Sequence, residues 1–350
     1  MPAHALGTVR ASVAPPQPSR VDEEFSLTDR HAEDDLARLA AGFQAIEANV
    51  AEVFEGKPDV VRLSLITLLA EGHLLLEDVP GVGKTLLAKA LARSIACSVR
   101  RVQFTPDLLP SDITGVTVYH QDRGDFEFKP GAVFANIVLG DEINRAGPKT
   151  QSALLEAMEE RTVTVDGRSH GLGVPFMVIA TQNPIELEGT YPLPEAQRDR
   201  FMMRLSIGYP SIEAELEVLE AHSRGDRVGS IEPVADARGV AALIETVKAV
   251  HAEPGVQRYV VELVRATRAH PDVELGASPR ASLALLRGAR ALAGGGEGRG
   301  YVLPDDVKAL VGPVLSHRLV LSPEAQLAGR GAEDVLADVV ASLPVPTGRG

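Results

Sequence analysis

The sequence predicts an α/β fold in which a mostly parallel sheet is flanked by helices, followed by a helical domain. Two patterns predict this architecture. Between residues 73 and 206, short apolar strand-like runs alternate with helix-like segments, as in parallel sheets with helical crossovers. After residue 209, apolar residues recur at three- and four-residue steps almost to the end of the chain, without strand-like runs.

The composition is that of a globular protein with enough apolar residues for a sizeable core. The 350 residues are 45% hydrophobic and 24% charged, and their number suggests two domains. The core must be aliphatic, because there is no Trp and aromatic residues make up only 4%. The formal net charge of −13 and the scarcity of aromatic rings disfavour nucleic acid as a partner.

Cysteine content and hydropathy exclude other classes of protein. Cys97 is the only cysteine, which rules out an intrachain disulfide and a thiolate metal site. Apolar runs such as residues 63–70 are far shorter than the about 20 residues that span a bilayer, and the N-terminus lacks the apolar stretch of a signal peptide. We therefore expect a cytoplasmic protein that does not insert into a membrane.

Three regions are expected along the chain. Residues 1–28 contain several Pro residues and no apolar periodicity, which predicts a flexible N-terminal tail. Residues 29–209 are expected to form the α/β core, and residues 210–350 the helical domain and a short C-terminal tail. Within that domain, the run Gly294-Gly295-Gly296 predicts a loop between two helices.

The elements of the core follow from local patterns, and the first helical spacing begins near His31. Strand-like runs are expected at residues 73–77, 99–104, 137–140, 176–181 and 201–206, and helices at residues 84–94 and 148–161. Two segments do not fit this alternation: residues 116–128 and 163–174 are each expected to form a β-hairpin. The hairpins are therefore insertions into the core.

A glycine-rich turn between the first strand and the next helix is typical of a phosphate site. The nucleotide-binding residues expected in this segment are Asp78, Val79, Pro80, Gly81, Val82, Gly83, Lys84, Thr85 and Leu86. Gly81 and Gly83 allow successive backbone N–H groups to point toward phosphate oxygens, beside the positive end of the following helix. The Lys84 ammonium is placed to bind the β- and γ-phosphates of ATP, and the Thr85 hydroxyl to coordinate Mg²⁺.

The turn departs from the usual pattern at Asp78, where the pattern has Gly. A strict motif search would miss this site for that reason. Taken alone, the turn is also compatible with an ordinary connection between a strand and a helix.

A second motif supplies two carboxylates. The strand-like run 137–140 is followed by Asp141 and Glu142, and ligands of open α/β sheets bind beyond the carboxyl ends of the strands. We expect Asp141 to hold Mg²⁺, directly or through water, and Glu142 to act as general base toward the attacking water. Such a pair alone is also compatible with a solvated strand end. Its combination with the Lys84 turn predicts a phosphate-binding site.

Four longer segments resemble the MoxR family of AAA+ ATPases. They are residues 76–85, 103–112, 141–146 and 192–197, and the likeness covers nearly the whole folded part of the chain. Small departures occur at Gly140, Ala132 and Arg198, where Ala, Pro and Leu are usual. The resemblance implies a P-loop AAA+ core with a five-stranded parallel sheet, a small all-α lid domain, and assembly into a hexameric ring.

The resemblance also implies roles that local patterns leave open. Asn183 matches the sensor-1 position, Arg200 the arginine finger that reaches a neighbour's nucleotide, and Arg280 the sensor-2 position. Arg145 is an alternative contact to the neighbour. By local pattern alone, Asn183 is a turn residue, Arg200 pairs with a nearby carboxylate, and Arg280 is a solvated first-turn residue. The two hairpins match insertions of this clade that usually face the pore of the ring.

The resemblance implies ATP hydrolysis coupled to chaperone-like remodelling or maturation of partner proteins, together with proteins that bear von Willebrand factor A domains. Two alternatives are open at this point: a nucleic-acid motor, because replicative helicases share the hairpin insertions, and the motor subunit of a metal chelatase. The net charge of −13 argues against the nucleic-acid motor.

Overall fold

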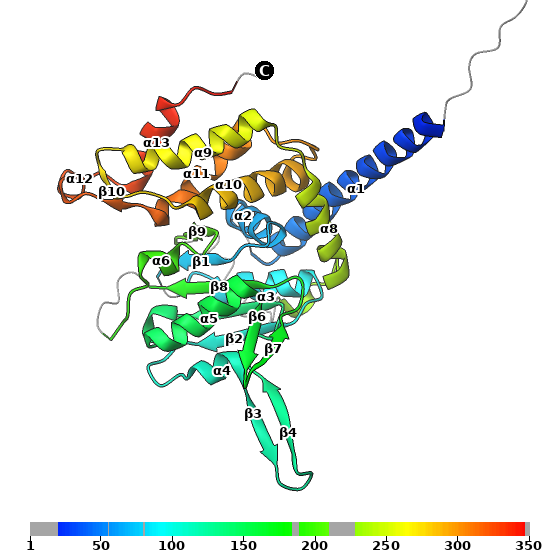
Figure 1. Cartoon of the computed structure of the whole chain (residues 1–350), viewed down its shortest axis with the longest axis vertical. Helices are drawn as coiled ribbons and strands as arrows, with labels where there is room; N and C mark the ends of the chain where they lie inside the picture. Colours follow the sequence, from blue (N-terminus) through cyan, green and yellow to red (C-terminus); the bar gives the residue numbers. More distant parts are fainter. Residues whose placement is uncertain (1–19, 55, 80, 184–188, 210–227, 347–350) are drawn as a thin grey trace, which may run out of the picture.

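The computed structural model describes residues 20–54, 56–79, 81–183, 189–209 and 228–346, in which a parallel sheet lies between helical layers (Figure 1). Residues 1–19 of the predicted tail lie outside the described residues. Helix α1 (Arg20–Ala51) begins well before the expected start near His31. The start of α1 thus lies within the segment 1–28 that was predicted as a tail.

Five strands form a single parallel sheet, as predicted. They are β1 (Leu74–Glu77), β2 (Val99–Gln103), β5 (Ile137–Asp141), β8 (Met177–Gln182) and β9 (Met203–Leu205). Their spatial order is β2-β5-β8-β1-β9, and each neighbouring pair is parallel. Because all strands run the same way, the residues that follow β1, β5 and β8 gather at one edge of the sheet, and the residues that precede β1 and β9 gather at the other.

The side chains of alternate strand residues pack into two separate hydrophobic cores, one on each face of the sheet. The helices concerned are α2 (Pro58–Leu69), α3 (Lys84–Ser94), α4 (Pro110–Thr114) and α5 (Pro148–Glu160). Leu74 faces the core that contains α1, α2, α3 and the C-terminal helices, whereas its neighbour Leu75 faces the core that contains α5. Full burial of one such side chain stabilises the fold by about 1.5–3 kcal/mol. The sheet is thus held from both faces by aliphatic packing.

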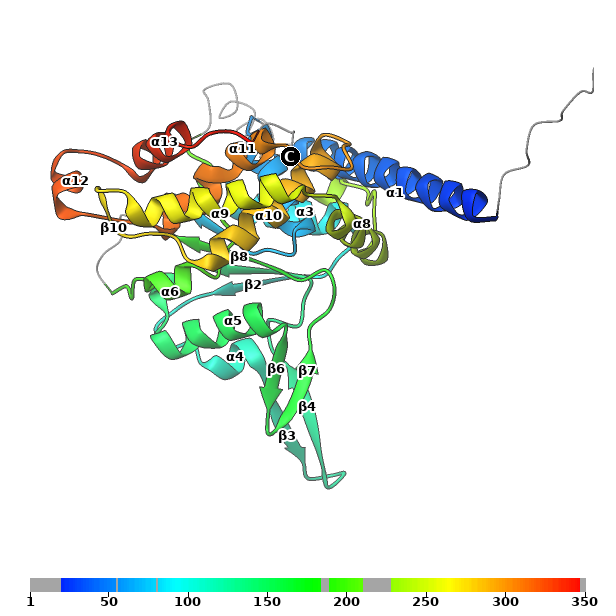
Figure 2. The same cartoon turned by 45° about the horizontal axis from the view of Figure 1, so that its top comes forward.

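Both predicted hairpins are confirmed. Strand β3 (Gly115–His120) pairs antiparallel with β4 (Asp125–Pro130), and β6 (Thr162–Val165) pairs antiparallel with β7 (Arg168–Gly171). The ring of Phe128 in the first hairpin stacks on that of His170 in the second, with centroids 3.9 Å apart. Figures 1 and 2 show β3–β4 projecting from the body, on the side away from the C-terminal helices.

The C-terminal region is helical, with one addition to the prediction. Its helices are α8 (Ala237–Ala249), α9 (Pro254–Ala269), α10 (Pro279–Ala291), α11 (Pro304–Leu315), α12 (Pro323–Leu327) and α13 (Ala332–Ser342). The strands β10 (Val273–Leu275) and β11 (Val320–Leu321) form a short antiparallel pairing that the sequence pattern did not indicate. The predicted domain boundary adjoins residues 210–227, which lie outside the described residues.

Short elements complete the description. They are α6 (Glu195–Arg198), η1 (Ile143–Arg145), η2 (Val228–Ser230), η3 (Leu292–Gly296) and η4 (Ser316–Arg318). In the part of the chain that the structure describes, none of the helices has the length and apolar character needed to cross a bilayer.

The run Gly294-Gly295-Gly296 belongs to a π-helical turn, η3, and the prediction of a loop was wrong. Helix α1 crosses this turn at close range: a Cβ atom on Gly295 would lie 2.5 Å from Cδ2 of Phe43. Close packing therefore explains the glycines better than chain reversal does. Through this contact α1, which the sequence assigned to the core domain, packs against the C-terminal region as well, including α8.

Two residues that often carry chemistry have structural surroundings here. His73 is buried, accepts the Val178 N–H at Nδ1 and donates from Nε2 to the Met158 carbonyl, at 2.9 and 3.1 Å. Burial lowers the pKa of His73 to about 4, so the ring is neutral. Burial also raises the pKa of the Cys97 thiol to about 11, which makes it a poor nucleophile.

The close approach at η3 makes a testable prediction. Gly295→Ala should destabilise the protein by about 1–3 kcal/mol, because the added methyl group must displace the Phe43 ring in a packed core. Gly171→Ala is the matched control, since its added Cβ would meet nothing within 4 Å. Urea unfolding measures both variants. Equal stability of the two would contradict the packing explanation.

Candidate functional site

A cleft of about 380 Å³ lies at the carboxyl edge of the sheet. Its walls come from four separate segments: the turn before α3, the strand β2, the end of β5 and the end of β8. The lining residues are Gly81, Gly83, Lys84, Thr85, Leu86, Arg101, Gln103, Asp141, Glu142, Thr181 and Asn183. The parallel order of the strands thus brings together most of the nucleotide-site residues that were predicted from separate motifs.

The remaining predicted turn residues have other positions. Val82 packs against the hydrophobic core, and neither it nor Val79 is part of the cleft lining. Pro80 lies outside the described residues.

The turn before α3 has a backbone that only glycine adopts without strain. Gly81 and Gly83 have φ angles of +88° and +97°, in the left-handed region. A Cβ atom on Gly81 would meet nothing within 4 Å, so the conformation and not the space requires glycine at this position. Since α3 begins at Lys84, the unpaired N–H groups of its first turn lie beside the cleft. The turn has the form of a phosphate cradle.

The side chain of Asp78 turns away from the cleft. Its carboxylate accepts hydrogen bonds from the backbone N–H groups of Ile207 and Gly208 and, at 3.1 Å, from the Ser206 hydroxyl. Its carbonyl oxygen accepts a hydrogen bond from the Lys84 ammonium. Asp78 has no positive φ angle, so its position does not require glycine. Asp78 therefore shapes the turn by fastening it to the segment after β9, and its carboxylate is not a nucleotide ligand.

The Lys84 ammonium lies in surroundings that suit an anionic ligand. Burial lowers its pKa, while the carboxylates of Asp78, Asp141 and Glu142 act in the opposite direction. A phosphate bound beside the ammonium would favour its charged form in the same way that these carboxylates do.

Thr181 connects the Asp141 side chain to the Glu142 backbone at the end of β5. Its hydroxyl donates to Oδ1 of Asp141 at 2.6 Å and accepts the backbone N–H of Glu142 at 2.9 Å. The other oxygen of Asp141 accepts from Arg101, at 2.6 Å from Nη2. The Asp141 carboxylate and the Thr85 hydroxyl line the same cleft, and such oxygen ligands are those that Mg²⁺ takes in proteins. The residues present therefore fit a magnesium ion.

Glu142 has a strained backbone and a side chain held by two neighbours. Its φ angle of +56° is uncommon for a residue with a Cβ atom, and such strain is often found at functional sites. Oε2 accepts from Nε2 of Gln103 at 2.8 Å and lies 3.3 Å from Nη1 of Arg145. In this arrangement one oxygen of the carboxylate is occupied by protein groups.

Three residues of the cleft were not assigned a role from the sequence: Arg101, Gln103 and Thr181. The parallel register sets Gln103 opposite Asp141, and alternation along β2 puts Arg101 and Gln103 on the same face. The pairing register of β2 with β5 would have identified these residues, but the register cannot be derived until the partner strand is known. Asn183, predicted as the sensor-1 residue, is buried in the cleft wall just after β8.

Arg200 and Arg280 lie elsewhere, in a second cavity of about 270 Å³. Nε of Arg200 is 3.2 Å from Oε2 of Glu159, and Arg280 forms an ion pair with Oε1 of the same carboxylate. Arg200 precedes β9, so it lies at the amino edge of the sheet, opposite the edge that carries the cleft. The structure thus brings these two arginines together, but apart from Lys84 of the same subunit.

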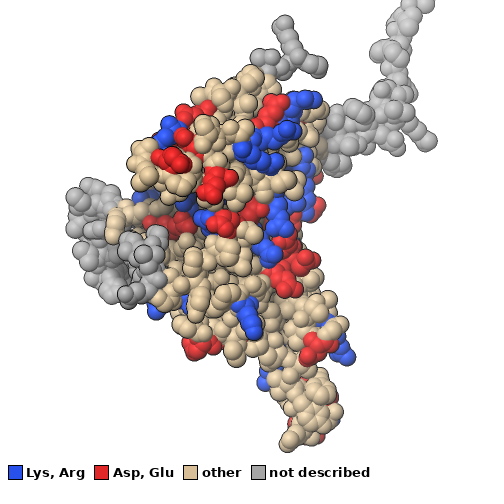
Figure 3. Space-filling view, turned by 60° about the vertical axis from the view of Figure 1, so that its left-hand side comes forward, with Lys and Arg blue, Asp and Glu red and all other residues tan. Residues whose placement is uncertain are grey.

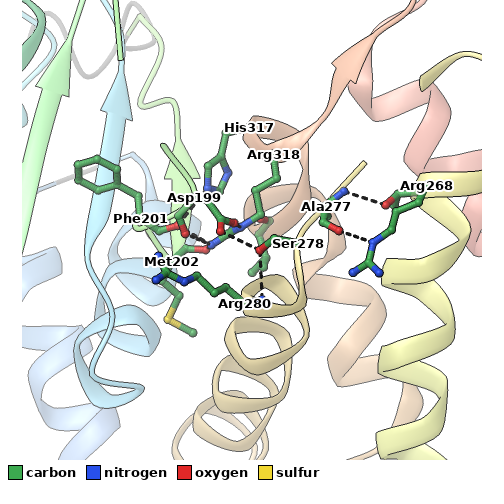
Figure 4. A network of polar contacts seen from close by, with 11 residues as sticks. Asp199, Phe201, Met202, Arg268, Ala277, Ser278, Arg280, His317 and Arg318 are labelled. Atoms are coloured by element: carbon green, nitrogen blue, oxygen red, sulfur yellow. Dashed lines mark hydrogen bonds and ion pairs between the residues drawn. The ribbon is translucent and has the colours of Figure 1, made fainter. Parts of the chain in front are cut away.

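A partly buried polar network joins the segments that carry these two arginines (Figure 4). The Asp199 carboxylate accepts from Nε of Arg318 at 2.8 Å and from the Ser278 hydroxyl at 2.7 Å. The same hydroxyl accepts the backbone N–H of Arg280 and so caps the start of α10. Asp199 thereby ties the residue before Arg200 to the helix that carries Arg280.

Comparison with known proteins gives matches to both parts of the chain. Residues 73–203 match the family described as "ATPase family associated with various cellular activities (AAA)", and residues 265–339 match the "AAA lid domain". The chain is 51% identical to "Uncharacterized protein YeaC" of Bacillus subtilis, over 87% of this chain and 95% of that protein. It is 42% identical to "Chaperone MoxR1" of Mycobacterium tuberculosis, over 88% of this chain and 84% of that protein.

Two further matches extend over most of the chain. Identity to "Protein MoxR" of Paracoccus denitrificans is 35%, over 87% of this chain and 97% of that protein. A crystal structure of a candidate ATPase from Cytophaga hutchinsonii is similar with a TM-score of 0.85 at 37% identity, and the match covers 92% of this chain and 100% of that one.

The geometry of the cleft predicts separate defects for two variants. Lys84→Ala should weaken ATP binding, because a phosphate would lose its charge-assisted partner. Glu142→Gln should keep ATP binding but lose turnover, because an amide cannot accept the proton of the attacking water. Calorimetry measures binding and phosphate release measures turnover. An equal loss of ATP affinity in both variants would contradict these assignments.

Proposed function

Because this chain belongs to the MoxR family of AAA+ ATPases, we propose that it couples ATP hydrolysis, in a ring of identical subunits, to the remodelling or maturation of partner proteins with von Willebrand factor A domains. The hexameric number comes from the family resemblance. The cytoplasmic location stays a prediction from the sequence.

In the proposed nucleotide site, each part of the cleft has one task. The N–H groups of the turn at Gly81–Leu86 and the Lys84 ammonium bind the phosphates of ATP, while Thr85 and Asp141 hold Mg²⁺. Bound Mg²⁺ supplies positive charge that neutralises the β- and γ-phosphate oxygens. Arg101 and Thr181 keep the Asp141 carboxylate in place through the hydrogen bonds described above.

Hydrolysis requires a base and an oriented water. Glu142 accepts the proton of the water, and the Asn183 amide orients that water toward the γ-phosphate. Glu142 must first exchange its contacts with Gln103 and Arg145 for a contact with the water. The resting arrangement therefore keeps the base occupied until ATP is bound.

One observation carries the ring proposal: Arg200 and Arg280 lie at the opposite edge of the sheet from the cleft of their own subunit. Arginine fingers act on the transferred phosphate, so in this fold they would have to act on the nucleotide of a neighbour. Arg145, the alternative contact, is bonded to Glu142 within its own subunit and is half-exposed. We therefore assign the trans role to Arg200, with Arg280 beside it.

The charge distribution argues against a nucleic-acid motor. On the face shown in Figure 3, Lys and Arg side chains are mixed with Asp and Glu side chains. On the projecting hairpin, Arg123 is bonded to Glu127 at 2.9 Å and lies 3.5 Å from Asp125. Binding of a polyanion needs cations that are free to release counterions, and this paired arginine is a poor one.

The trans role of Arg200 predicts rescue between two inactive variants. Arg200→Ala should lower turnover by about 10³–10⁵ and leave ATP binding intact, because a finger stabilises only the transition state. Mixed with Glu142→Gln subunits, it should regain part of the activity, since some interfaces then combine an intact Glu142 with an intact Arg200. Phosphate release is measured after subunit exchange has been verified by fluorescence. A mixture no more active than the sum of its parts would exclude the trans role.

The proposed partner class predicts what a trapped ring captures. Glu142→Gln with ATP should retain clients and adaptors, because the ATP-bound state persists without turnover. Proteins recovered from a lysate of the producing cells are identified by mass spectrometry, with Lys84→Ala as the matched control that cannot hold ATP. We expect a protein with a von Willebrand factor A domain among those enriched by the trap. Recovery of the same proteins with both variants would contradict the proposal.

A further inference from the structure

Glu159 links two arginines that come from distant parts of the chain. It lies in the last turn of α5, whereas Arg200 precedes β9 and Arg280 lies in the first turn of α10. Each of its carboxylate oxygens contacts one arginine, Oε2 with Arg200 and Oε1 with Arg280. Each guanidinium group thus contacts one oxygen of the same anion, and the two groups would bind a phosphate in the same arrangement.

The positions of the two arginine segments do not depend on Glu159. The Asp199 carboxylate already fastens the residue before Arg200 to Ser278 at the start of α10, and it does so through partly buried contacts. Arg318 adds hydrogen bonds from its guanidinium to the carbonyl groups of Phe201 and Met202 (Figure 4). This network sets the two segments side by side. The contacts of Glu159 therefore set only the direction in which the Arg200 and Arg280 side chains point, and they compensate part of the positive charge of these side chains.

The other two carboxylates of the second cavity, Glu71 and Asp199, are paired with other cations. The charged lining residues are Glu71, Glu159, Arg161, Asp199, Arg200, Arg280, Arg287 and Arg318. Glu71 binds Arg161 at 2.7 Å and Lys248 at 3.0 Å, and Asp199 binds Arg318. Glu159 is thus the carboxylate of this cavity that contacts Arg200 and Arg280.

We propose that Glu159 is a positioning residue of the ring: it holds Arg200 and Arg280 side by side in the free subunit and gives them up to the γ-phosphate bound to the neighbouring subunit. The inference rests on the proposed function, because it requires both arginines to act in trans. Glu159 then stands in for the phosphate before assembly and opposes its arrival by one negative charge.

The exposure of the three side chains fits this exchange. Their exposed fractions are 34% for Glu159, 31% for Arg200 and 49% for Arg280, so the contact is open to a second subunit. Exposed ion pairs contribute little to stability, and a multiply charged phosphate is a stronger acceptor than one carboxylate. The ion pairs with Glu159 can therefore align the two arginines in the free subunit, and a phosphate can replace Glu159 as their acceptor.

Assembly at increasing ATP concentration tests the inference. Light scattering of the full chain is recorded with Mg·ATP or Mg·ADP for the wild type, Glu159→Gln and Glu159→Ala. Removing the charge should lower the ATP concentration at half-assembly by roughly three- to tenfold, the effect expected of one unit charge a few ångströms from a phosphate in a hydrated site. Assembly with ADP should not shift, because ADP has no γ-phosphate.

Two controls separate the inference from a general effect. Glu324→Gln removes the same charge from an exposed residue of α12, which forms no ion pair among the described residues and lines neither cavity that contains Arg200. It should assemble like the wild type. ATP affinity at a dilution where subunits are single should be unchanged in Glu159→Gln, because Glu159 lies far from the cleft of its own subunit. Thermal unfolding verifies that each variant is folded.

The outcomes distinguish the two levels of proposal. If the wild type shows no ATP-dependent assembly, the ring itself is wrong. If the wild type assembles and Glu159→Gln needs the same or more ATP, the role of Glu159 is wrong while the ring stands. An equal shift with Glu324→Gln, or an equal shift with ADP, would also overturn it.

Discussion

The parallel pairing of β1 between β8 and β9 is the constraint on which the rest of the structure depends. Because β1 runs in the same direction as both neighbours, the turn that follows it lies beside the ends of β8 and β5, where the carboxylates and Asn183 are. The same pairing puts the segment before β9 at the other edge. One sheet therefore separates the residues of the nucleotide cleft from Arg200 and Arg280, and in the proposed ring a lone subunit would have only half of each composite site.

Candidate site residues could be predicted from the sequence where a single segment contains the whole pattern. The turn at Gly81–Thr85 and the carboxylates after β5 were predicted, because a backbone with positive φ and an apolar strand with polar ends leave their pattern in neighbouring residues. Arg101, Gln103 and Thr181 gave no such pattern, since their role arises from the register between strands. Glu159 could not be predicted at all, because its two partners lie on different elements that meet only after folding.

The errors of prediction have the same physical origin. The run at Gly294–Gly296 looked like a loop because three glycines weaken a helix, but here they make room for a helix from the other end of the chain. Asp78 looked like a defect in a phosphate-binding pattern. Its carboxylate instead fixes the turn by three hydrogen bonds to residues 206–208. In both cases a distant contact overrode the local signal.

The stacking of Phe128 on His170 gives the projecting hairpin a mechanical connection to the rest of the subunit. Glu159 lies in the last turn of α5, from which Arg161 alone leads into β6, and β6 pairs with the strand that carries His170. A displacement of the end of α5 would therefore move β6–β7, and through the stacked rings of His170 and Phe128 it would move the hairpin β3–β4. In the proposed ring, the tip of the projecting hairpin would in this way be linked to the residues that meet the neighbour's nucleotide.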